Sequence, residues 1–139
     1  MKNLILLILM VTFLPSLQFP QGVSGELGED WRTKAELTDF RETPSYDETV
    51  SYGRRLAAAS ELIEIRMIGR SSEGRDIPLL IAAKKGNFDP RSAKVNKKAV
   101  ILVQAAIHAG ESDGKDAGLA LLRDIAVTGA LRDLLDQYS

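Results

Sequence analysis

The feature that most constrains this chain is an apolar run, residues 99–107, that leads directly into His108-Ala109-Gly110-Glu111. Only Gln104 interrupts the run, and this pattern is typical of a strand buried on both faces of a helix-flanked sheet. A strand that ends in such a turn holds the imidazole of His108 and the carboxylate of Glu111 rigidly, and both donor types suit zinc. The run therefore predicts an α/β sheet with a metal site at the end of a core strand.

The residue types available for a metal are limited. His108 is the only histidine of the chain, and cysteine is absent. A catalytic zinc site needs three protein ligands and an open position for water, so a third ligand would be another carboxylate or come from elsewhere. Asp113 is close in sequence, but an acid at this position usually complements the start of a helix. As a bare motif, a histidine with a glutamate three residues on is more often structural than catalytic.

Length and charge limit the classes of function. A chain of 139 residues holds at most one ordinary domain. Its net charge of -1 argues against nucleic acid as a partner, because such a role needs a dominant basic face. Without cysteines there is no disulfide framework and no thiolate chemistry.

The N-terminus has the order of a secretory signal peptide. Lys2 precedes the apolar residues 4–14, and Pro15, a more polar stretch and the small residues Ser24 and Gly25 follow. The apolar run is shorter than the roughly 20 residues needed to span a bilayer. We predict a signal peptide over residues 1–25, a secreted or periplasmic protein and no stable membrane insertion after cleavage. A retained leader would instead anchor the chain in a membrane.

The first part of the remaining chain divides into a lead-in and the start of a domain. Residues 26–44 are polar and irregular, and we expect a poorly ordered lead-in before a domain over residues 45–139. Ser45 and Glu48 form a capping-box pattern that predicts a helix to about Ser60.

Two strands and a loop are expected next. Residues 62–68 and 76–83 are rich in branched side chains, and the turn chemistry of residues 70–75 between them predicts an antiparallel hairpin. Residues 84–98 are strongly charged and are expected to form a surface loop.

The C-terminal part predicts a further helix. Ser112 or Asp113 can cap it, and Gly129 suits its C-terminal end. Its expected core face has Ala117, Leu121, Leu122 and Ile125 at helical spacing, and the leucine stripe from Leu119 to Leu135 is expected to pack in the core. Residues 130–137 begin another amphipathic turn or two.

In this order of elements, no later strand follows that could pair with the apolar strand over residues 99–107. An unpaired strand edge of this kind favours aggregation. We therefore expect the N-terminal part of a mixed sheet flanked by helices, truncated before its later core strands.

Two segments resemble a known family. Residues 68–77, followed by the strand into residues 107–111, are similar to the zinc carboxypeptidases of the carboxypeptidase A type. The resemblance extends from about Tyr46 to the C-terminus. It implies zinc as cofactor, with His108 and Glu111 as the first two ligands of a His₂Glu site.

The chain also departs from this family. The resemblance implies that the second histidine ligand, the catalytic glutamate and the carboxylate-binding residues all lie beyond Ser139, so no catalytic residue is expected within the chain. Gly110 and Ser112 stand where many members carry Arg and Trp, which leaves the substrate-binding residues unknown. In a complete relative the substrate is the C-terminus of a peptide or protein, and zinc activates the attacking water.

Three functions remain open. The first is an N-terminal fragment of a secreted zinc metallocarboxypeptidase that is inactive alone. The second is a secreted, non-catalytic relative that binds a peptide or partner. The third is a small membrane-anchored module unrelated to peptidases. The coding sequence after Ser139 separates them, because a continuing reading frame with a further His and Glu would support the first.

Overall fold

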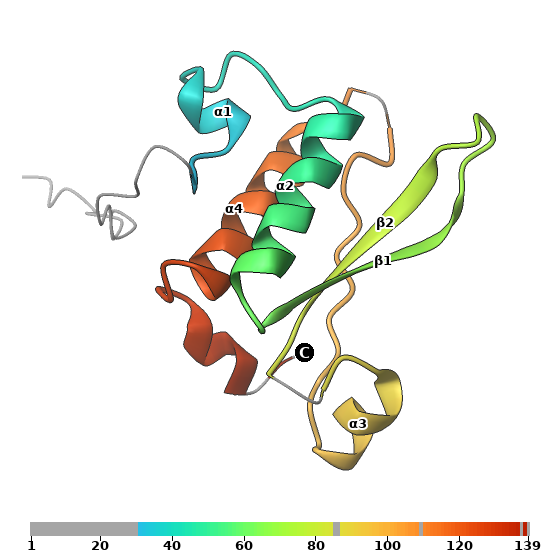
Figure 1. Ribbon diagram of the computed structural model, residues 1–139, viewed down its shortest axis with the longest axis vertical. Coiled ribbons are helices and arrows are strands. Elements are labelled where there is room, and N and C mark those ends of the chain that lie inside the picture. Colours follow the sequence, from blue (N-terminus) through green and yellow to red (C-terminus); the bar gives the residue numbers. More distant parts are fainter. Residues whose placement is uncertain (1–30, 85–86, 109, 137, 139) are drawn as a thin grey trace, which may run out of the picture.

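The computed structural model describes residues 31–84, 87–108, 110–136 and 138. Helices α2 (Tyr46–Ala59) and α4 (Asp113–Ala126) lie side by side, and strands β1 (Ile63–Arg70) and β2 (Asp76–Ala82) form a twisted antiparallel ribbon beside them (Figure 1). The shorter helices are α1 (Lys34–Leu37), α3 (Pro90–Val95) and the 3₁₀ helix η2 (Arg132–Asp136). The α/β class with helices beside a sheet is confirmed.

The predicted signal peptide, residues 1–25, lies outside the described residues. Among those that are described, no helix is long and apolar enough to cross a membrane.

Local signals place α2 where the sequence predicts it. The Ser45 hydroxyl accepts a hydrogen bond from the Glu48 amide at 3.3 Å, and the Glu48 carboxylate accepts one from the Ser45 amide at 2.7 Å. This capping box satisfies two backbone donors that a helix start otherwise leaves without partners. The helix ends at Ala59, and the amide of the C-cap residue Ser60 donates to the carbonyl of Leu56.

The predicted hairpin is also confirmed. Ile63 pairs with Ala82 at its base, and the register continues regularly to Met67 and Pro78 before a bulge that leads to the Arg70–Asp76 pair. Gly74 turns the chain with φ of +80°, a conformation that costs glycine little. The hairpin tip points away from the two long helices (Figure 1).

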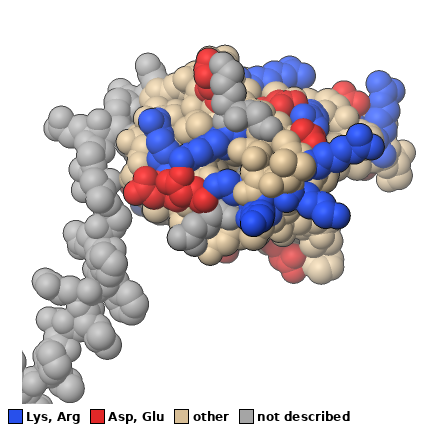
Figure 2. Space-filling model, turned by 90° about the horizontal axis from the view of Figure 1, so that it is seen from below, with Lys and Arg blue, Asp and Glu red and all other residues tan. Residues whose placement is uncertain are grey.

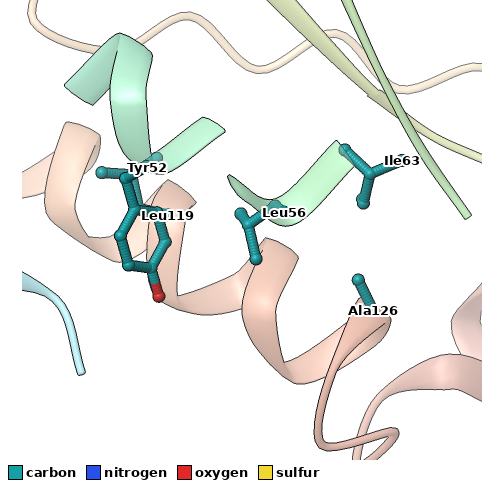
Figure 3. Packing of buried hydrophobic residues seen from close by; sticks show 5 residues of the cluster. All are labelled: Tyr52, Leu56, Ile63, Leu119 and Ala126. Atoms are coloured by element: carbon teal, nitrogen blue, oxygen red, sulfur yellow. The ribbon is translucent and has the colours of Figure 1, made fainter. Parts of the chain in front are cut away.

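The hydrophobic core lies where α2, α4 and the base of β1 meet. Its buried residues are Tyr52, Leu56, Ile63, Leu119 and Ala126 (Figure 3). Leu56 is fully buried, and Leu80 of β2 packs against the same cluster. The core therefore joins both long helices to the hairpin.

The predicted core face of α4 is only partly right. Ile125 is buried and Leu122 is half-buried, but Ala117 and Leu121 are exposed. The buried face instead runs through Leu119, Arg123, Ile125 and Ala126. Leu119, part of the predicted leucine stripe, is confirmed as a core residue. Arg123 was missed because hydrophobic spacing does not reveal a buried charged residue.

The lead-in contains more structure than expected. Within its described part, Thr33 and Glu36 form a second capping box around α1, and the Tyr52 hydroxyl donates to the Trp31 carbonyl at 2.7 Å. Arg123, only 4% exposed, donates to the Glu36 carboxylate and pairs with Asp124 at 3.0 Å. The expectation of an irregular segment fails here because α1 is stabilised by tertiary contacts with α2 and α4.

The predicted loop 84–98 also contains a helix. Asp89 caps α3 by accepting hydrogen bonds from the amides of Arg91 and Ser92 at 2.9 and 3.0 Å, and Pro90 occupies the first turn. An aspartate followed by proline is a recognised helix start. This signal was present in the sequence but was hidden by the high charge of the segment.

The predicted core strand over residues 99–107 is not formed. In the described part of the chain, its sheet pairing is limited to a parallel bridge between Ala99 and Tyr138. Four consecutive apolar side chains, residues 100–103, are 58–72% exposed. A strand buried on both faces needs hydrogen-bonding neighbours, but β1 and β2 pair only with each other among the described residues.

Candidate metal centre

The structure brings the two predicted ligands together. His108 Nδ1 lies 2.8 Å from Glu111 Oε1, and the Glu111 amide donates to the His108 carbonyl at 3.0 Å. These bonds close one turn of chain between the apolar segment and α4. Both side chains are exposed, at 76% for His108 and 63% for Glu111. Both side chains are therefore accessible from solvent.

The residues just before the turn lead the chain onto the start of α4. Ala106 has φ of +55°, a left-handed conformation that is uncommon for alanine. A Cβ added to Gly114 would lie 3.5 Å from the Cβ of Ala105, so the residues just before the turn contact the first turn of α4. Left-handed non-glycine residues are concentrated at functional sites, and this one redirects the chain two residues before His108.

The first turn of α4 is also attached to the end of the lead-in. Lys115 Nζ donates to the carbonyl of Pro44, and the Thr43 hydroxyl donates to Asp116 Oδ2 at 2.5 Å. These anchoring residues carry no signal in the sequence. The partners lie more than 70 positions apart, and no local pattern connects them.

Asp113 is the first residue of α4 and is exposed. Its position in the first turn agrees with a role at the helix start, where a carboxylate complements the positive end of the helix dipole. Ser112 occupies the N-cap position but its side chain makes no capping hydrogen bond.

The donor set fits two positions of a zinc site. Ligands at about 2.0–2.1 Å in a tetrahedral arrangement lie roughly 3.3 Å apart. The His108 and Glu111 donors, at 2.8 Å, need to separate by about half an ångström, and both side chains are exposed enough to rotate. Among the residues described, no group of three or more His, Cys, Asp or Glu side chains could hold a metal ion. These two donors are fewer than the three protein ligands that a catalytic zinc site needs.

The turn lies within a segment that matches a known protein family. Residues 49–139 match the family model of zinc carboxypeptidase. The chain belongs to the zinc carboxypeptidase family, and the matched residues represent an N-terminal-type portion of it. No curated protein and no solved structure matches the chain.

Proposed function

We propose that this chain is the N-terminal portion of a secreted zinc metallocarboxypeptidase and contributes His108 and Glu111 to its metal site. The observation that carries the proposal is the 2.8 Å approach of an imidazole nitrogen and a carboxylate oxygen on one turn. That turn lies inside the residues that match the zinc carboxypeptidase family.

The two side chains have separate tasks in this proposal. His108 must present a neutral imidazole, because a protonated ring has no lone pair for a metal. Glu111 supplies a negative charge that offsets part of the charge of a divalent ion. In a complete site the zinc would polarise the scissile carbonyl and acidify the attacking water. The exposure of both donors leaves space for a peptide C-terminus, the substrate of the complete enzyme.

The chain alone is proposed to be inactive. It contains a single histidine, whereas the zinc site of carboxypeptidase A requires two. The general base and the groups that bind the terminal carboxylate are expected beyond Ser139. Exposed apolar residues 100–103 support the same proposal, since further strands of a longer domain would cover them.

A peptidase assay tests the proposal. The purified 139-residue chain is expected to release no C-terminal residues from peptides. A protein extended by the coding sequence after Ser139 is expected to release them, and chelation or His108→Ala should abolish this release. Chelator-sensitive release by the 139-residue chain would contradict the proposal of an inactive fragment.

A non-catalytic relative is the second candidate, and the exposed residues 100–103 favour it as well, because they could contact a peptide or partner. A stop codon directly after Ser139, together with stable expression, would support this candidate. The family match excludes a module unrelated to peptidases.

A further inference from the structure

The charge of this chain is distributed very unevenly. Residues 84–98 contain six lysines and arginines but only one acidic residue, Asp89, which gives a net charge of +5. The chain as a whole carries -1, so the remaining residues carry -6. A basic segment on an otherwise acidic chain suggests a contact with an anionic surface.

Three of these cations lie on α3 or just after it. Ala93 is the buried side of α3, whereas Arg91, Lys94 and Lys97 are exposed and make no ion pair with the described residues. Figure 2 views the molecule from the α3 side and shows several blue side chains around tan atoms. We call Arg91, Lys94, Val95 and Lys97 the basic face.

Two further lysines attach this segment to the rest of the molecule. Lys84 forms an ion pair with Asp136, and Lys98 donates to the carbonyl oxygens of Leu135 and Asp136 in η2. The basic face is therefore held on a fixed part of the fold.

The backbone at Lys97 provides an independent observation. Its φ is +54°, and its amide donates to Lys94 while the Lys98 amide donates to Ala93. These are the two hydrogen bonds of a Schellman motif, whose left-handed position is usually glycine. A lysine here costs backbone energy that glycine would avoid.

We propose that the basic face binds an anionic phospholipid surface. Val95 lies among the cations and is 78% exposed. An apolar side chain surrounded by cations suits a bilayer interface, where it can enter the headgroup region. A soluble polyanion offers no such apolar phase. The acidic remainder of the chain would be repelled by the same surface, so binding would orient the molecule. This proposal is independent of the zinc site.

Vesicle sedimentation of the full chain tests the proposal, with phosphatidylcholine vesicles that contain or lack phosphatidylserine. The triple variant Arg91→Gln/Lys94→Gln/Lys97→Gln should bind the anionic vesicles about a hundredfold more weakly, at about fivefold for each cation. The matched control, Arg41→Gln/Arg54→Gln/Arg70→Gln, removes the same charge from other exposed positions and should lose less than about tenfold. Equal losses would mean that only net charge matters, and would overturn the proposal, as would no loss in the first triple variant.

Lys97→Gly removes one cation without endangering the fold. It should keep or raise the stability of the chain and still weaken binding about fivefold. Unchanged binding would contradict the role given to Lys97.

Val95→Ala distinguishes a lipid surface from a soluble polyanion. It should weaken vesicle binding severalfold and leave binding to heparin or duplex DNA unchanged. Tighter binding to either polymer than to anionic vesicles, with no effect of Val95→Ala, would show that the partner is a polyanion and that the lipid proposal is wrong.

Discussion

At the scale of single residues, the most consequential side chain outside the metal turn is Arg123. It is 4% exposed and bonds to the Glu36 carboxylate, to Asp124 and, at 3.4 Å, to the carbonyl of Trp31. Burial by itself would lower the pKa of Arg123, but the two carboxylates outweigh it and raise the pKa above its ordinary value. The guanidinium is thus fully charged and joins the lead-in to α4.

Replacing Arg123 with methionine should destabilise the chain by about 3 kcal/mol, because Glu36 would be left as a partly buried, unpaired carboxylate. Urea denaturation measures the change. The double variant Arg123→Met/Glu36→Gln should recover part of the loss, since Glu36 is then neutral and only the carboxylate of Asp124 still lacks its cation. Arg54→Met, at an exposed position, should change stability by less than about 0.5 kcal/mol. An effect of Arg123→Met no larger than this control would contradict the structural role.

The lowered pKa of Glu48 predicts that the stability of the fold depends on pH. The hydrogen bond from the Ser45 amide, followed by that from Lys34, lowers its pKa from 4.5 to about 2. A carboxyl group whose pKa is lowered by folding stabilises the fold above its unfolded pKa, and this contribution is lost as pH falls through the folded pKa. The difference in urea midpoint between the wild type and Glu48→Gln should therefore be largest above pH 4.5 and disappear near pH 2. A difference that stays constant over this range would contradict the assignment.

At the scale of elements, helices α2 and α4 each contain a glycine, but only the glycine of α2 is closely packed. A Cβ on Gly53 would lie 3.0 Å from Leu80 Cδ2 and 3.4 Å from Ile65 Cδ1, so α2 packs closely on the hairpin. Gly118 of α4 has nothing within 4 Å of the position that an added Cβ would take.

We predict that Gly53→Val destabilises the chain by about 2 kcal/mol through overpacking. Gly118→Ala should stabilise it by about 0.5–1 kcal/mol through helix propensity. Thermal denaturation compares the two, and stabilisation by Gly53→Val would show that the helix and hairpin do not pack as described.

The sequence predicted those elements whose signals are local. The Ser45–Glu48 capping box places α2, and branched residues on both sides of a turn place the hairpin. Elements that depend on distant partners could not be predicted in this way. Helix α1 is stabilised by Arg123, and the strand over residues 99–107 needs neighbouring strands. At the metal centre, the His108–Glu111 pair was predictable, but its anchors at Thr43 and Pro44 were not.

At the scale of the whole molecule, the fold leaves a long apolar segment in solvent. Residues 100–103 are exposed in succession next to a two-stranded sheet whose outer edges are free within the described chain. Edges and apolar patches of this kind promote association. We predict that light scattering of the 139-residue chain will show association that increases with concentration.

Leu102→Lys should reduce this association with little loss of stability, because Leu102 is 72% exposed. In a longer protein whose further strands cover the segment, the same change should instead destabilise the fold. A monodisperse wild-type monomer with a sharp thermal transition would contradict the prediction.

Equilibrium zinc binding to the 139-residue chain tests whether His108 and Glu111 are metal ligands. The wild type should bind zinc weakly, and less well in acid, because only a neutral imidazole binds. His108→Ala and Glu111→Ala should abolish this binding, whereas Asp113→Ala should retain it, with circular dichroism confirming that each variant is folded. If the His108→Ala chain bound zinc as well as the wild type, the histidine would be a structural residue and the metal-site assignment would be wrong.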